Sequence, residues 1–401
     1  MKTLEDVKQY FFNIIEDPDY IVLEPKKNIK NLLILDPGLF HIATCRSGIS
    51  KIDGENGRLY YRGISIEKLV DNQDFIDVAF YIIGENISDA QSKDKFNANV
   101  RKYFCLSPEL KAVLDSIPAG IHPMSFAAIG ITTLSSVESK YLENQDDLKE
   151  KAKFIIAQMA VIAAYYYLKL HNKEWIKEDA DQSIAYNFLN QLFHDQIKYD
   201  LPVMSKIFNK VLILHAEHDQ NCSTATVRAI ASAGGDIYSA VAAGIAAFKG
   251  NLHGGASQNV AEMYEEFLLH NLDVNDYVNE KLKNKQRLMG FGHRIYSCWD
   301  PRAKIMLNML NANEFKDPMV DAYKSIALKL IARVGSDEFF IKRGIYPNPD
   351  LLNCIFYKLL GVPSSMNTVM LAVSRVAGWV AHYIEHVNDK LPIMRPCQLQ
   401  K

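Results

Sequence analysis

The sequence predicts an all-α protein with a large helical domain and a smaller helical domain, together with a short β-hairpin region near the N-terminus. From about Ser65 onward, apolar residues recur at helical spacing, and Asp, Ser and Pro punctuate the segments. Strand-like alternation is concentrated between about residues 40 and 63. A length of 401 residues favours a second, smaller domain beside the main core.

The hairpin is predicted from residues 48–63, GISKIDGENGRLYYRG, which alternate on either side of Asn56-Gly57. Both positions of this dipeptide tolerate positive φ. We therefore expect a tight turn there.

Several apolar segments predict helices of the core. Leu148 to Leu170 is the longest, and its apolar stretch is interrupted by Gln158 and too short for a membrane span, so a buried helix is expected. Val211 to His218 and Ala240 to Phe248 are nearly all apolar and predict two central helices. The small residues of the second fit close packing either inside one subunit or against another subunit.

Composition limits the classes of partner. The formal net charge of -2 gives no electrostatic reason to expect a nucleic-acid or membrane-surface partner. The six cysteines are scattered without a CxxC pair, which is typical of reduced thiols. Residues 1–20 lack the basic start and apolar run of a secretory signal, so we expect a cytoplasmic protein.

Three segments place a polar side chain in a setting marked by glycine or proline. The first is NLHGGA, residues 251–256, where two glycines after His253 permit a sharp turn and close approach of a ligand. A helix from about Ala256 to Leu269 would point its N-terminus toward this loop, which disfavours imidazolium and leaves a neutral hydrogen-bond donor. The alternative is a loop histidine bonded to backbone.

The second segment is GFGHRIY, residues 290–296, followed by Asp300-Pro301-Arg302. Here His293 again lies beside glycines, and a guanidinium follows nine residues later. Arginine binds carboxylates well because its fork makes two parallel hydrogen bonds. Asp300-Pro301 is also a helix-start signal, so a purely capping role for Asp300 is the alternative.

The third segment is YPNPD, residues 346–350, which leads into an apolar helix. A carboxylate at a rigid, proline-marked corner is a well-placed general base. Asp before a helix is also a favoured N-cap, and on this segment alone capping is the better interpretation of Asp350.

Two further arginines and a histidine pair complete the candidates. Arg375 lies in an apolar run, where a charge is costly unless it is paired, so an internal salt bridge is its alternative role. Arg395 lies in the C-terminal tail, where an arginine is normally a solvated surface charge. His215 and His218 are three residues apart, whereas zinc-hydrolase helices place histidines four apart, so no metal site is predicted.

Taken together and in order, these segments resemble the citrate synthase family, in particular its bacterial hexamer-forming branch. The resemblance covers the chain from about residue 35 to the C-terminus. It rests on LILDPGLFHIATCRSGISKIDGENGRLYYRG, IHPM, ILHAEHDQNCSTATVR, HGGA, LMGFGHRIYSCWDPR, YPNPD, GVPSSMNTVM, SRVAGWVAHY and MRP, which all fall in family order.

The resemblance implies condensation of acetyl-CoA with oxaloacetate and water to citrate and CoA. By position, His253 would stabilise the acetyl-CoA enolate, Asp350 would remove a methyl proton, and His293 would polarise the oxaloacetate carbonyl. The residues implied to bind the carboxylates of oxaloacetate and citrate are His218, Arg302, Arg375 and Arg395.

The resemblance also implies a domain arrangement and an assembly. Residues 1–254 and 361–401 would form the large domain, and residues 255–360 a small domain that closes when oxaloacetate binds. Arg395 would reach the site of a neighbouring subunit, so the assembly is at least a homodimer, with a hexamer as the larger form. No metal, flavin or other cofactor is implied, because the coenzyme A thioester is a substrate.

Two positions depart from the family pattern. After GFGHRIY the family usually carries a basic residue, where this chain has Ser297-Cys298. The family amide after HGGA is replaced by Ser257. Contacts to the phosphates of coenzyme A would then fall to other basic groups, for which Arg287 and Lys358 are the candidates.

The alternative functions differ either in the substrate or in the functional class of the protein. A 2-methylcitrate synthase uses the same acid–base groups on propionyl-CoA, and one methylene contributes only about 1–3 kcal/mol of discrimination. A non-catalytic, metabolite-binding regulatory homologue would not need His253, His293 and Asp350 together. A metal-dependent hydrolase is the third alternative.

Overall fold

The computed structural model describes residues 12–16, 21–25, 35–86, 88–118, 120–195, 200–312 and 317–400. Two compact units can be distinguished. One consists of residues 1–46 with 395–401, and the other of residues 47–394.

The first unit contains a hairpin that the sequence reasoning did not anticipate. Strands β1 (Phe12–Glu16) and β2 (Ile21–Pro25) pair antiparallel, with Phe12 opposite Pro25. Two short runs rich in β-branched and aromatic residues flank Asp17-Pro18-Asp19, a usual turn composition, so the signal was present in the sequence.

The predicted hairpin region is present in the second unit. Strands β3 (Ser50–Asp53) and β4 (Arg58–Tyr61) pair antiparallel, and β5 (Ile64–Ser65) adds to β4. The connection has four residues, 54–57, and only Gly57 of the Asn56-Gly57 pair has positive φ, at 62°. The predicted hairpin is thus present at this position, and Asp53 holds its connection by accepting hydrogen bonds from the backbone and side chain of Asn56.

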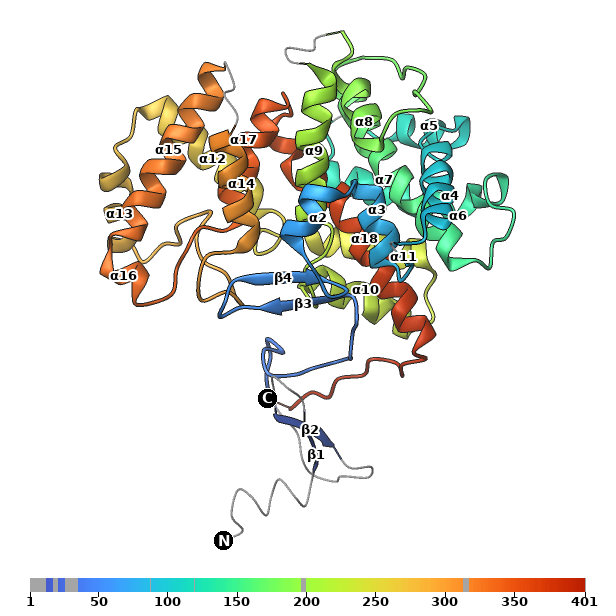
Figure 1. The fold of residues 1–401 in the computed structure, drawn as a ribbon, viewed down its shortest axis with the longest axis horizontal. Coiled ribbons are helices and arrows are strands. Elements are labelled where there is room, and N and C mark those ends of the chain that lie inside the picture. The colour runs from blue at the N-terminus through green and yellow to red at the C-terminus, as the bar shows by residue number, and fades with distance from the viewer. Residues whose placement is uncertain are drawn as a thin grey trace. The chain divides into compact units, whose positions relative to one another are not determined.

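The rest of the second unit is helical, as predicted (Figure 1). Its first helices are α2 (Ile66–Asn72), α3 (Phe75–Ile82), α4 (Ala90–Lys102), α5 (Pro108–Ser116), α6 (Pro123–Val137), α7 (Leu148–Leu170), α8 (Ile184–Phe193), α9 (Leu201–His215), α10 (Cys222–Ser232) and α11 (Ile237–Phe248). The remaining helices are α12 (Ala256–His270), α13 (Val274–Lys283), α14 (Pro301–Ala312), α15 (Pro318–Gly335), α16 (Glu338–Ile341), α17 (Pro349–Leu359) and α18 (Asn367–Asn388). Short 3₁₀ segments cover Glu138–Lys140 and Ser364–Met366.

Helices α7 and α18 form the centre of the core. They pack against each other, and α18 also contacts α9, α10 and α11. By length and composition α7 could cross a membrane, but 83% of its apolar window is buried inside the protein. It is the buried helix predicted between Leu148 and Leu170.

The helices α12 to α17 form a second packing group of this unit (Figure 1). Helix α17 packs against α12, α14 and α15, and α13 packs against α15. The group follows the candidate loop at residues 251–256 and ends before α18. The domain boundaries 255 and 360 remain a prediction.

One core helix begins and ends earlier than predicted. The apolar segment from Val211 to His218 was expected to be helical throughout, but α9 ends at His215. The next residues form an irregular segment in which Asp219 has a φ of 54°. His218 thus lies in a buried connection between α9 and α10.

Candidate active site

The His253 loop is a tight turn that enters α12. The helix begins at Ala256, as predicted. A Cβ on Gly254 would lie 2.6 Å from the Phe248 carbonyl oxygen, so the backbone approaches α11 too closely for any side chain. This approach sets the His253 ring edge-on against Phe248, with ring centroids 4.6 Å apart.

Hydrogen bonds assign the proton of the neutral His253 ring. Its Nε2 lies 3.3 Å from the backbone nitrogen of Ser223, 2.9 Å from the Ser223 hydroxyl and 3.2 Å from Oδ1 of Asn221. The backbone N–H can only donate, so Nε2 is the acceptor in that contact. Asn221 caps α10, so this nitrogen faces the N-terminus of α10. The predicted helix α12 also begins beside the loop, where the Ala256 N–H bonds the His253 carbonyl. An accepting Nε2 leaves the proton on Nδ1.

Burial keeps His253 neutral. It lowers the pKa of the ring to about 4, and the charge of Arg375 adds to the effect. At neutral pH the residue is therefore a hydrogen-bond donor through Nδ1, which is the group that a developing enolate oxygen requires.

Backbone pairing joins the His293 loop to the start of α17. Gly292 donates its N–H to the Tyr346 carbonyl at 2.7 Å, and Asn348 donates to the Gly290 carbonyl at 2.9 Å. Gly290 has a φ of 80°, and a Cβ there would lie 2.9 Å from the Cβ of Leu351. The second and third predicted segments therefore form one structural element.

The His293 ring has the opposite proton assignment from that of His253. Its Nδ1 accepts from the backbone N–H groups of Ile295 at 3.0 Å and Tyr296 at 3.3 Å. The proton of the neutral ring is then on Nε2. Burial lowers the pKa of His293 to about 4, and Arg302 adds to this shift, so the ring is a neutral donor.

Asp350 is not the cap of α17. Asn348 is the N-cap, since its side chain accepts the N–H of Asp350, and Pro349 is the first helical residue. The capping interpretation of Asp350 was wrong because the Pro at the first position moves the cap to the residue before it. The carboxylate of Asp350 is thus not needed to cap the helix. Burial raises its pKa to about 6, and Arg302 opposes that rise.

Two buried arginines flank these groups. Arg302 forms a bidentate ion pair with Asp300, through Nε at 3.0 Å and Nη2 at 2.7 Å. Asp300 also accepts the N–H of Arg302 at 2.9 Å, so it both caps α14 and orients the guanidinium. Arg375 donates through Nε to the His215 carbonyl at 2.8 Å, and it forms no ion pair within the described ranges. Burial lowers the pKa of Arg375 to about 10, where it stays charged at neutral pH.

His218 completes the cluster. Its ring centroid lies 5.1 Å from that of His293, and its Nε2 lies 3.3 Å from the Tyr296 hydroxyl. Burial, together with Arg302, places the pKa of His218 well below its usual range. The two arginines also act on the pKa of Asp350, so these side chains share one electrostatic environment.

This cluster favours an anionic ligand over a metal ion. Ligand atoms of His218, His293 and Asp300 do lie within 4.8 Å of one another. However, both oxygens of Asp300 accept hydrogen bonds from Arg302, whose charge opposes a cation. Buried guanidinium groups and neutral imidazole donors are the groups that bind a dicarboxylate.

The other three predicted binding residues are Arg395, Arg287 and Lys358, each of which has its own surroundings. Arg395 belongs to the other compact unit, where its side chain is exposed and donates to the Pro396 carbonyl at 2.8 Å. Arg287 is exposed. Lys358 is half-buried, with its Nζ 5.8 Å from the centroid of the Tyr323 ring.

Sequence reasoning missed the residues that orient the histidines. Ser223 is fully buried and accepts the indole N–H of Trp379 at 3.0 Å while it contacts His253. An Asn before an apolar helix is a capping signal, so Asn221 could have indicated a helix start there. The sequence around Asn221 does not show that this helix start faces His253, because the two are thirty residues apart.

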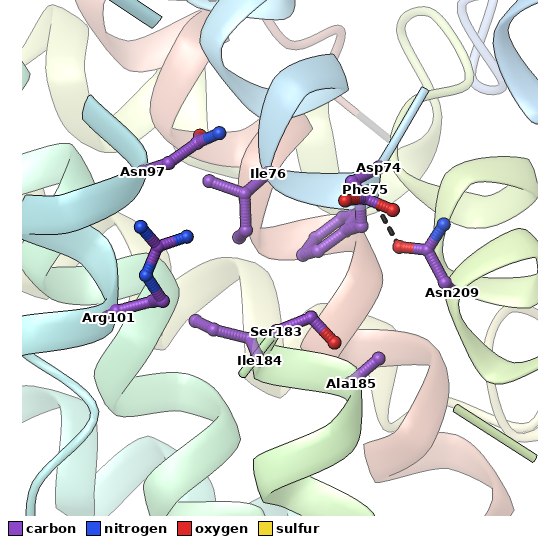
Figure 2. A pocket seen from close by; sticks show the side chains of 9 residues that line it. All are labelled: Asp74, Phe75, Ile76, Asn97, Arg101, Ser183, Ile184, Ala185 and Asn209. Atoms are coloured by element: carbon purple, nitrogen blue, oxygen red, sulfur yellow. Dashed lines mark hydrogen bonds between the residues drawn. The ribbon is translucent and has the colours of Figure 1, made fainter. Parts of the chain in front are cut away.

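A cavity elsewhere in this unit lacks such chemistry. It lies between α3, α4, α8 and α9, and Figure 2 shows Asn97 and Arg101 on one side and Asp74 and Asn209 on the other, with Ile76 and Phe75 between them. Its volume is about 30 Å³, enough for roughly one water molecule. No histidine lines it.

Comparison with known proteins gives concordant matches. Residues 38–397 match the family model described as citrate synthase, C-terminal domain. The chain is 35% identical over 377 residues to citrate synthase of Corynebacterium glutamicum, covering 92% of this chain and 86% of that protein. It is 34% identical over 393 residues to citrate synthase 1 of Mycobacterium tuberculosis, covering 96% and 91%.

Solved structures agree with these matches. The citrate synthase of Thermotoga maritima superposes with a TM-score of 0.80 at 33% identity, covering 92% of this chain and 96% of that chain. The citrate synthase of Thermoplasma acidophilum, solved as a ternary complex with carboxymethyl coenzyme A and oxaloacetate, has a TM-score of 0.82 at 29% identity. The coverage there is 91% of this chain and 95% of that chain.

Proposed function

Since the chain belongs to the citrate synthase family, we propose that it condenses acetyl-CoA with oxaloacetate and water, releasing citrate and CoA. The observation that carries the proposal is the set of three half-buried groups with complementary protonation. Two neutral histidines present opposite ring nitrogens as donors, and a carboxylate with a pKa of about 6 is available as a base.

The first step is removal of a methyl proton from acetyl-CoA. A thioester methyl is a very weak acid, so a base and an oxyanion donor must act on opposite ends of the incipient enolate. We assign the base to the Asp350 carboxylate and the donor to Nδ1–H of His253. Deprotonation then places negative charge on the thioester oxygen, where a neutral donor stabilises it.

The second step forms the carbon–carbon bond. The enolate carbon attacks the carbonyl carbon of oxaloacetate, and Nε2–H of His293 donates to the carbonyl oxygen as it becomes an alkoxide. Arg302, Arg375 and His218 hold the carboxylates. Water then cleaves the thioester of the condensation product, which releases CoA.

The remaining assignments belong to the same proposal. Residues 255–360 would close over the bound substrates as a small domain, which excludes water from the enolate. Arg395 would act in the site of a neighbouring subunit of a homodimer or larger assembly. Arg287 and Lys358 would contact coenzyme A.

The proposal is tested by following free thiol release from acetyl-CoA. The purified protein should release CoA only when oxaloacetate is present, and propionyl-CoA assayed in parallel measures the preference for the acyl group. The matched control omits oxaloacetate. Thiol release no faster than background with both substrates present would contradict the proposal, and faster turnover of propionyl-CoA would reassign the enzyme as a 2-methylcitrate synthase.

A further inference from the structure

Asn353 lies one helical turn beyond Asp350 on α17. Residues three apart on a helix are neighbours on one face, so the amide is adjacent to the carboxylate. Asn353 is completely buried. Its Oδ1 lies 2.8 Å from Nε2 of His215, which is also buried and comes from the end of α9.

His215 fixes the orientation of this amide. Burial holds the pKa of His215 well below its usual range, so the ring is neutral. Its Nε2 can bond Oδ1 of Asn353 only as a donor. The reverse amide orientation would turn Oδ1 toward the Asp350 carboxylate, where two oxygens that only accept hydrogen bonds repel each other.

The other end of the amide has no partner in the described part of the chain. Nδ2 of Asn353 is buried and has no partner at full hydrogen-bond geometry, although the side chain is close enough to the Asp350 carboxylate to lower its pKa. A buried donor without a partner is unfavourable and rare in folded proteins, so such a group needs an explanation.

We propose that Asn353 is a positioning residue for the base: His215 turns its amide so that Nδ2–H₂ faces the Asp350 carboxylate and stabilises its ionised, proton-accepting form. This inference rests on the proposed function, in which Asp350 is the base. The electrostatics agree with the geometry. Burial raises the pKa of Asp350, Arg302 opposes this, and the Asn353 amide opposes it further.

The proposed role of Asn353 affects the protonation of Asp350 alone. The charged and titratable side chains facing Asp350 are Arg302 and Asp300 at the start of α14, Arg375 on α18, and Cys354 and Tyr357 on its own helix. Replacing Asn353 leaves all of them in place. The change should therefore appear as a shift of one titration.

The test measures kcat against pH for the full-length enzyme with saturating acetyl-CoA and oxaloacetate. In Asn353→Leu, which keeps the volume but removes the amide, the acid limb should move up by about one pH unit, because a hydrogen bond to an ionised group is lost. Below the limb this corresponds to an approximately tenfold lower kcat. The KM for oxaloacetate should change less than about twofold, since the guanidinium contacts are kept.

Two variants of the orienting residue and one control complete the design. His215→Gln keeps an N–H at the position of Nε2 and should keep the pH profile, whereas His215→Leu should move the limb in the same direction as Asn353→Leu. The control is Asn187→Leu on α8, which removes another buried amide, bonded to the backbone of Asp179. That variant should lose stability without moving the limb.

The outcomes separate the two hypotheses. If the wild-type enzyme shows no oxaloacetate-dependent thiol release, the proposed function fails. If the wild type is active but Asn353→Leu lowers kcat equally at every pH, Asn353 has only a structural role and this inference is overturned. If Asn353→Leu does not fold, a limb in His215→Leu that matches the wild type overturns it instead.

Discussion

His253 and His293 lie in glycine-marked loops, whereas Asp350 lies in the first turn of a buried helix. At each histidine a backbone N–H group, which can only donate, selects one ring nitrogen. Ser223 at the start of α10 bonds Nε2 of His253, and Ile295 in the same loop bonds Nδ1 of His293. At the helix start the equivalent backbone donor is taken by the cap Asn348, so the Asp350 carboxylate is left available.

The comparison shows one physical cause acting in two directions. Burial disfavours the charged form of any group, so it lowers the pKa of both histidines to about 4 and raises that of Asp350 to about 6. Two neutral donors and a base suited to neutral pH result from the same low-dielectric surroundings. Backbone N–H groups, from α10 for His253 and from its own loop for His293, add the choice of nitrogen, which burial alone does not make.

The largest expected effect comes from removing the base. Asp350→Asn keeps the size of the side chain but cannot accept the methyl proton, so kcat should fall by about 10²–10⁴-fold. Oxaloacetate binding should persist, because Arg302 and Arg375 are untouched. Steady-state kinetics with a separate titration of oxaloacetate binding measure both. Loss of binding and turnover together would indicate a structural role for Asp350.

A smaller effect should distinguish the two loops. The amide nitrogen of Asn reaches the position of Nδ1, and that of Gln reaches the position of Nε2. Replacing His253 or His293 by Asn or Gln should lower kcat by about 10²–10³-fold in each case. The remaining kcat should be higher in His253→Asn than in His253→Gln, and higher in His293→Gln than in His293→Asn. The measurement is kcat for each variant. The same preference at both positions would contradict the opposite proton assignments.

The sequence predicted the parts that depend on local pattern. The helix Leu148–Leu170 and the start of α12 at Ala256 are as expected from apolar spacing and turn residues. The cap at Asn348 was also readable, since Pro349 is favoured at the first helical position, but the acid at Asp350 was given more weight.

Contacts across the chain were beyond such reasoning. The N-terminus of α10 faces His253 from thirty residues away, which no local pattern encodes. The pairing of residues 290–292 with 346–348 is equally remote in sequence. The pKa shifts depend on burial by several elements at once. Sequence identified the reactive residue types, and tertiary packing decided their protonation.

The smallest expected effect is the pH dependence of the unmodified enzyme, which compares the protonation of Asp350 with that of the two histidines. Because the pKa of Asp350 is raised to about 6, its basic form is populated above that pH and is lost as the pH falls through it. The histidines, with pKa values of about 4, stay neutral throughout this range and add no second limb. The kcat/KM, which reports the free enzyme, should therefore fall about tenfold per pH unit below 6, with a slope of one. A slope of two between pH 5 and 7 would mean that a histidine protonates together with Asp350. The pKa values of the loop histidines would then not lie below that of Asp350.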